Sequence, residues 1–103
     1  MINPKLKLSP TDIAAFCGRH KVKRLSLFGS ATRGDFRPDS DVDVLVEFEA
    51  NSRASLLDLV DMQNELSRIF DNRPVDIATP SILRNPFRRR TIMRDLEVVY
   101  GGA

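Results

Sequence analysis

Apolar and polar positions alternate in three short stretches of this chain, and each stretch predicts a β-strand. The clearest is 41–49, where positions 42, 44, 46 and 48 are apolar while positions 41, 43 and 47 are acidic. A second strand is predicted over 22–28 and stops at a glycine. A third is predicted over 74–78, with Val75 and Ile77 on one face and Asp76 on the other.

Apolar residues at helical spacing predict helices between these strands. The first begins after Ser9, the expected N-cap, which precedes a proline suited to the first helical position. The longest is predicted over 54–70, about four turns. A last helical stretch begins at Pro80 and is interrupted near Pro86, and residues 97–100 are expected to close as a short strand or a helix end.

The order of the elements predicts the fold class. Residues 30–33 are expected to form a short helix, and 34–40 a loop rich in turn-forming residues. The resulting order predicts an α/β (or α+β) domain, built on a small mixed β-sheet flanked by helices. We interpret 1–103 as a single domain, because a chain of this length buries one core and leaves little room for a second module.

Composition narrows the class of protein. The chain is 42% hydrophobic and 29% charged, which is ordinary for a soluble globular protein. No stretch approaches the apolar length of a membrane span and the N-terminus lacks a signal-peptide pattern, so we expect a cytoplasmic protein without membrane contact. The single cysteine, Cys17, excludes an internal disulfide and a thiolate zinc site, and its place on an apolar helical stripe predicts a buried thiol.

Charge is unevenly distributed. The net charge is +2, but residues 80–94 carry five arginines and no acid, so this segment is +5 and the remainder −3. Only Phe87 neighbours the run 88–90, and without interleaved aromatic residues the pattern favours a solvated face or a protein interface over nucleic-acid binding. Apolar residues around Leu83 and Phe87 are candidates for an oligomer interface.

Asp41 and Asp43 are candidate metal ligands. Residues two apart on a strand project from the same face, roughly 6 to 7 Å apart. Two carboxylates in that position repel each other unless a cation lies between them, and Mg²⁺ prefers such hard oxygen ligands. An isolated Asp-x-Asp, however, is more often a turn followed by a solvated strand residue.

Gly29 and Ser30 add a candidate phosphate-binding element. A glycine at the end of a strand permits a sharp turn, and a serine opening a short helix offers a hydroxyl and free amides to a phosphate. A Gly-Ser pair alone is a common turn. Asp76 supplies a third carboxylate on the same acidic face if its strand lies beside that of Asp43, although an edge-strand charge is an equal alternative.

Together these residues resemble a known family. Leu27-Phe28-Gly29-Ser30-Ala31-x-Arg33-Gly34, then Ser40-Asp41-x-Asp43 and a later Val75-Asp76, are similar to the minimal nucleotidyltransferases of the polymerase-beta superfamily. Gly-Ser, ten residues and Asp-x-Asp form the signature of that superfamily, and the spacing fits here without insertion. The resemblance extends over essentially the whole chain.

The resemblance implies a role for each motif residue. Asp41 and Asp43 would hold Mg²⁺ that bridges the triphosphate of ATP or another NTP. Asp76 would complete a two-metal site and help to deprotonate the acceptor hydroxyl. Gly29-Ser30 would cradle the β,γ-phosphates, and Arg33 would clamp the pyrophosphate.

Two further residues, Arg37 and His20, are expected to contribute less to phosphate binding and catalysis than the motif residues. Arg37 is a weaker candidate for the clamp than Arg33. His20, the single histidine, lies at the end of the first predicted helix, where a capping or packing role is more typical than catalysis.

The resemblance also implies a biological role. Free-standing minimal nucleotidyltransferases are commonly paired with a HEPN-domain toxin, and the transferase acts as antitoxin by moving AMP from ATP to a tyrosine of the toxin. The alternative is a non-catalytic binding module that neutralises a partner by steric masking. A third hypothesis is transfer to a small molecule, but relatives of that type generally carry an additional domain.

Overall fold

The computed structural model describes residues 2, 6–33, 37, 40–53 and 56–101. Within these residues the protein forms a four-stranded sheet in the order β3-β2-β1-β4. The strands are β1 (Val22–Phe28), β2 (Val42–Phe48), β3 (Val75–Ala78) and β4 (Glu97–Gly101). β1 is antiparallel to both β2 and β4, whereas β2 and β3 are parallel. The sheet is therefore mixed, as predicted, and residues 97–100 form a strand rather than a helix end.

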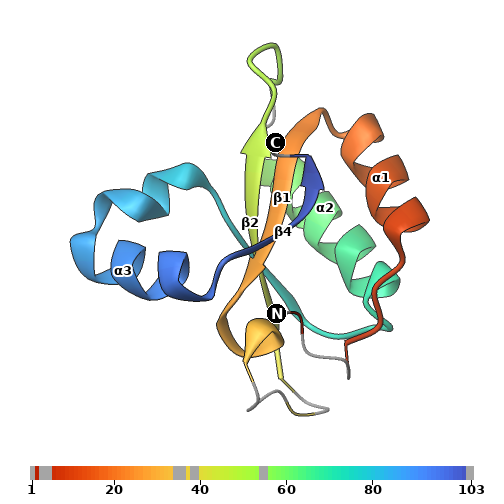
Figure 1. Cartoon of the computed structure of the whole chain (residues 1–103). Coiled ribbons are helices and arrows are strands. Elements are labelled where there is room, and N and C mark those ends of the chain that lie inside the picture. Colours follow the sequence, from red (N-terminus) through yellow and green to blue (C-terminus); the bar gives the residue numbers. More distant parts are fainter. Residues whose placement is uncertain (1, 3–5, 34–36, 38–39, 54–55, 102–103) are drawn as a thin grey trace.

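Helices cover both faces of this sheet (Figure 1). α1 (Pro10–Arg19) and α2 (Leu56–Ile69) lie on one side, and α3 (Pro86–Asp95) lies on the other. The short 3₁₀ helices η1 (Gly29–Thr32) and η2 (Pro80–Arg84) complete the order of elements in the described part of the chain.

The ends of these helices follow from local chemistry. Ser9 caps α1 as predicted, since its Oγ accepts a hydrogen bond from the Asp12 amide at 3.4 Å. The expected break at Pro86 is confirmed, because Asn85 leaves helical geometry and its side chain accepts hydrogen bonds from the amides of Phe87 and Arg88. None of the described helices is long and apolar enough to cross a membrane.

The main core lies between the sheet and the α1–α2 layer. Its largest fully buried side chains include Phe16 of α1, Leu66 of α2 and Phe70 just beyond α2. They pack on the face of the sheet formed by β1 residues such as Leu25 and β2 residues such as Val44. The alternation in β2 predicted this buried face, and Val42, Val44 and Val46 are all 0% exposed.

A second, smaller cluster occupies the opposite face of the sheet. Phe28 and Leu45 pack there against Ile92 of α3. Leu83, which the sequence analysis places at an exposed apolar surface, is half-buried against this cluster because η2 folds back over the sheet. Phe87, by contrast, is 83% exposed, as expected.

The predicted loop 34–40 lies outside the described residues except at Arg37 and Ser40. These two form a turn directly before β2. The Ser40 amide donates to the Arg37 carbonyl at 3.0 Å, and the Arg37 amide donates to Ser40 Oγ at 2.8 Å. Arg73 donates to the same Arg37 carbonyl at 3.0 Å, which ties the turn to the segment that leads into β3.

Candidate active site

The candidate site lies where β1 ends and where β2 and β3 begin. Asp43 is paired in register with Phe28 of β1 on one side and with Asp76 of β3 on the other. Because β2 and β3 are parallel and neighbouring strands lie roughly 4.8 Å apart, the side chains of Asp43 and Asp76 leave the same face side by side. The adjacency that the sequence analysis required for Asp76 is therefore present.

Gly29 permits the placement of Asp43. Its φ is +71°, a conformation that side-chain-bearing residues rarely adopt. A Cβ added at this position would overlap Asp43 Oδ2 and lie 3.3 Å from Asp43 Cγ. The carboxylate of Asp43 thus lies directly against the Cα of Gly29, in space that exists only because residue 29 has no side chain.

The site carries an excess of negative charge around Asp43. Partial burial raises the pKa of the Asp43 carboxyl most, and the charges of Asp76 and then Asp41 raise it further. Arg33 and Arg88 act in the opposite direction. Asp41, just before β2, and Asp76, on the edge strand β3, are both exposed. A cation bound among these carboxylates would relieve their repulsion.

The carboxylates of Asp41, Asp43 and Asp76 are chemically suited to a divalent cation, since carboxylate oxygens are the ligands that Mg²⁺ prefers. Across the described parts of the chain, however, no three His, Cys, Asp or Glu side chains are placed to hold a metal ion together. The structure thus shows the pairing of Asp43 with Asp76, while the three-carboxylate metal site stays a prediction.

η1 forms the predicted phosphate-binding side of the site. The short helix expected over 30–33 is the 3₁₀ turn that begins at Gly29. Fully buried Ala31 anchors it, and the Arg33 amide closes it by donating to the Ser30 carbonyl at 3.1 Å. Thr32 Oγ1 adds a hydrogen bond of 3.0 Å to the Gly29 carbonyl. Ser30 itself is half-buried and lies next to the glycine that contacts Asp43.

Two arginines bring positive charge to the carboxylates. Arg33 Nη1 donates to Asp95 Oδ2 of α3 at 2.9 Å, and the Arg33 charge lowers the pKa of Asp43. Arg88 of α3 also lowers this pKa, although sequence reasoning placed it only on a solvated face or a protein interface. The helical spacing could have indicated this position, because Arg88 precedes buried Ile92 by four residues and hence lies on the same side of the helix.

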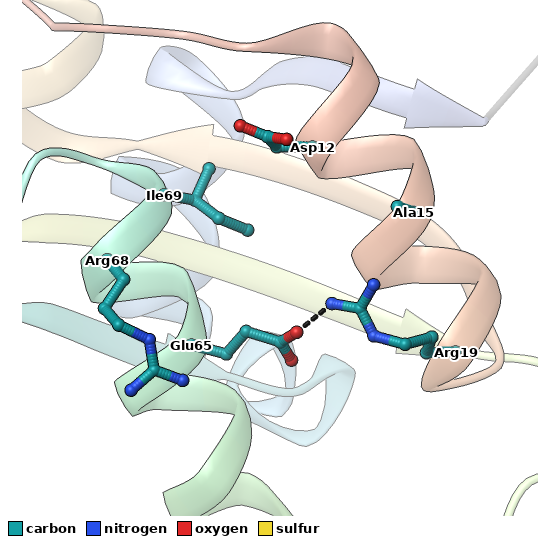
Figure 2. A pocket seen from close by; sticks show the side chains of 6 residues that line it. All are labelled: Asp12, Ala15, Arg19, Glu65, Arg68 and Ile69. Carbon is teal, nitrogen blue, oxygen red and sulfur yellow. Dashed lines mark hydrogen bonds and ion pairs between the residues drawn. The ribbon is translucent and has the colours of Figure 1, made fainter.

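A polar hollow of about 270 Å³ lies elsewhere, between α1 and α2 (Figure 2). Its lining residues are Asp12, Ala15, Arg19, Glu65, Arg68 and Ile69. Figure 2 shows Arg19 of α1 and Glu65 of α2 paired across it. This hollow is on the α1–α2 side of the sheet, whereas Asp43 shares the α3 side with Leu45, so the two are separate features.

His20 and Cys17 take the structural places expected of them. The His20 ring lies 4.6 Å from the Phe16 ring, centroid to centroid, and its Nε2 is 2.6 Å from Glu65 Oε2. These contacts join the end of α1 to α2. Cys17 is buried in the main core, and burial raises the pKa of its thiol to about 12.

Comparison with known proteins agrees with this geometry. A family model described as nucleotidyltransferase domain matches residues 13–99. The protein adenylyltransferase MntA of Thermococcus cleftensis is 38% identical over 82 residues, which are 80% of this chain and 77% of that protein. A Methanocaldococcus jannaschii protein with the provisional name protein adenylyltransferase is 35% identical over 78 residues, covering 76% of this chain and 77% of the relative.

Solved structures show the same fold. A protein provisionally named minimal nucleotidyltransferase superimposes with a TM-score of 0.66 at 33% identity, covering 85% of this chain and 86% of that one. A toxin–antitoxin crystal structure with AMP-PNP gives a TM-score of 0.69 at 20% identity, covering 92% of this chain and 75% of the other. The family match runs from α1 to β4 and includes the whole acidic cluster, and the chain therefore belongs to the nucleotidyltransferase domain family.

Proposed function

We propose that this nucleotidyltransferase is a Mg²⁺-dependent protein adenylyltransferase of the cytoplasm. It transfers AMP from ATP to a tyrosine hydroxyl of a HEPN toxin and thereby acts as antitoxin. The observation that carries the proposal is the register of Asp43 with Asp76 beside Gly29. Two comparisons support the acceptor class: a 38% identical relative is named a protein adenylyltransferase, and a structural neighbour is a toxin–antitoxin with AMP-PNP.

The carboxylates hold the metal in this proposal. Asp41, Asp43 and Asp76 provide the oxygen ligands, and bound Mg²⁺ supplies neutralisation of the triphosphate charge. Gly29-Ser30 contacts the β,γ-phosphates, and Arg33 contacts the pyrophosphate that leaves. The raised pKa of Asp43 supports this assignment, because both its main cause, burial, and the added charges of Asp76 and Asp41 disfavour the ionised carboxyl, which a bound cation stabilises.

Transfer is an in-line displacement at the α-phosphorus. The acceptor oxygen forms a bond to this phosphorus, the bond to the oxygen that bridges to the β-phosphate breaks, and pyrophosphate leaves. Asp76 takes the proton of the acceptor hydroxyl. Its position favours an acceptor on another molecule, because Asp76 is exposed and β3 is an edge strand.

The test is transfer from labelled ATP. The protein is incubated with Mg²⁺, α-labelled ATP and a HEPN protein encoded beside it, and label on the HEPN tyrosine is the expected result. The variant carrying both Asp41→Asn and Asp43→Asn should give no label. Absence of transfer by the wild-type protein, with the partner folded and Mg²⁺ present, would contradict the proposal.

Steric masking remains the second candidate function. It is favoured by the exposed Phe87 on a helix whose surface is rich in arginine, a combination enriched at protein interfaces. The same double variant separates the two accounts. If it still neutralises the toxin while labelling is lost, binding rather than AMP transfer is the function.

A further inference from the structure

An ion pair joins two residues that are 62 positions apart in the chain. Arg33, directly after η1, donates from Nη1 to Asp95 Oδ2, the last residue of α3, at 2.9 Å. The other carboxylate oxygen of Asp95 accepts from Arg94 Nε at 3.3 Å. The pair thus connects the end of α3 to the short segment that carries Gly29 and Ser30.

The two partners differ in exposure. The Arg33 side chain is 40% exposed, whereas that of Asp95 is only 9% exposed. A nearly buried carboxylate loses stability when a cationic partner leaves, so movement of Arg33 away from Asp95 is penalised even though Arg94 stays in contact with the other carboxylate oxygen. Asp95 is the buried half of the pair, and Arg33 is the half that reaches solvent.

The backbone around Asp95 is anchored to the site by packing. Ile92, one turn earlier in α3, is 2% exposed and packs with Phe28 and Leu45. Phe28 immediately precedes Gly29, and Leu45 follows Asp43 by two residues. The Asp95 carboxylate therefore has a defined position relative to both halves of the candidate site.

Arg33 also lies near Asp43, because it directly follows η1, whose first residue, Gly29, lies against the Asp43 carboxylate. The guanidinium is a rigid planar fork with donors on more than one edge. A hydrogen bond from one nitrogen to a fixed carboxylate orients the whole plane, and other donors of the group can then meet phosphate oxygens. A flexible arginine without such a partner would have to be ordered on each binding event.

We propose that Asp95 is a positioning residue: it holds the Arg33 guanidinium beside Asp43 in the orientation that receives the β,γ-phosphates of ATP. The inference rests on the proposed function, which assigns Arg33 to the triphosphate. It predicts that Asp95 governs affinity for the triphosphate and leaves affinity for a nucleoside monophosphate unchanged.

The test is the affinity of the whole chain for Mg·ATP and for AMP, measured by isothermal titration calorimetry. Asp95→Asn is nearly isosteric and is expected to weaken Mg·ATP binding by about tenfold, with AMP binding unchanged. A loss of stability alone would weaken both nucleotides alike. Unchanged or tighter binding of Mg·ATP by Asp95→Asn would overturn the inference, and tighter binding would identify Asp95 as a competitor for Arg33.

A double-variant comparison tests whether Asp95 acts through Arg33. In an Arg33→Gln background, Asp95→Asn should cause no further loss of Mg·ATP affinity. The double variant also removes both charges together, so it leaves no unpaired buried charge and is expected to fold even if Asp95→Asn alone is unstable. A further severalfold loss in the double variant would overturn the inference.

The matched control is Glu47→Gln, which removes the Arg24–Glu47 ion pair of 3.3 Å on the same sheet. It should leave affinity for Mg·ATP and for AMP at the wild-type level. Wild-type protein that binds no Mg·ATP would overturn the proposed function together with this inference. Wild-type binding combined with wild-type affinity in Asp95→Asn would overturn this inference alone.

Discussion

The carboxylate of Asp43 lies against the Cα of Gly29, in the volume that a Cβ at residue 29 would fill. The two residues come from neighbouring strands, because Asp43 pairs in register with Phe28, the residue before Gly29. The phosphate-binding turn and the acidic strand of the proposed site are thus in direct contact. A change in either residue should disturb the other.

Gly29→Ala should destabilise the protein and abolish transfer. The added Cβ overlaps Asp43 Oδ2, and φ is +71°, so we expect the free energy of unfolding to fall by about 1–3 kcal/mol. Urea denaturation and ATP labelling measure the two effects. The control is Gly18→Ala in α1, where an added Cβ has no heavy atom within 4 Å and should stabilise the helix by about 0.5–1 kcal/mol. Equal effects of the two substitutions would contradict the packing of Asp43 on Gly29.

Asp43→Asn should make the metal-free protein more stable at neutral pH while abolishing transfer. The folded state raises the pKa of Asp43, so it favours the protonated carboxyl and loses stability as pH rises through this raised pKa. An asparagine side chain does not ionise, so the variant does not lose this stability as the pH rises. The gain in melting temperature should shrink below about pH 4, where Asp43 is protonated in both states.

Magnesium provides a second measurement of the same variant. Mg²⁺ should raise the melting temperature of the wild-type protein, because a bound cation offsets the repulsion around Asp43. The rise should be smaller in Asp43→Asn. A variant less stable than wild type at pH 7 without metal would contradict the electrostatic account.

Ser26→Ala should stabilise the protein slightly. Ser26 is 0% exposed, and its Oγ has no hydrogen-bond partner among the described residues. Removing a buried, unpaired hydroxyl should raise the free energy of unfolding by up to about 1 kcal/mol. Ser67→Ala is the contrasting substitution, because Ser67 Oγ donates to the Arg73 carbonyl at 2.6 Å and its loss should cost about 1 kcal/mol. Chemical denaturation of both variants measures whether the two changes in the free energy of unfolding have opposite signs.

Cys17 should be unreactive in the folded protein. The side chain is 1% exposed, and burial raises the pKa of its thiol to about 12, so almost no thiolate is present at pH 8. A thiol reagent such as Ellman's should react fully only in denaturant. Because Cys17 is the sole cysteine, the signal reports this residue alone. Rapid reaction in native buffer would contradict its burial in the main core.

The local pattern of apolar, polar and capping residues was sufficient to locate the helices and strands. The alternation in 41–49 predicted both β2 and its buried face, and Ser9 and Pro86 predicted helix boundaries that the structure contains. These features depend on neighbours a few residues away, so the sequence alone determines them. The Gly-Ser and Asp-x-Asp spacing likewise identified the residues that gather at one end of the sheet.

Tertiary structure decided which of these residues meet. Asp43 faces Asp76 because β3 adds in parallel beside β2, and Arg33 meets Asp95 because α3 packs across the second face of the sheet. The packing of α3 likewise brings the charge of Arg88 near enough to lower the pKa of Asp43, although the arginine run indicated only a solvated face or a protein interface. The spacing of apolar residues indicates on which face of its own helix or strand a side chain lies. The order and packing of the elements depend on burial between distant segments, and only the folded chain determines them.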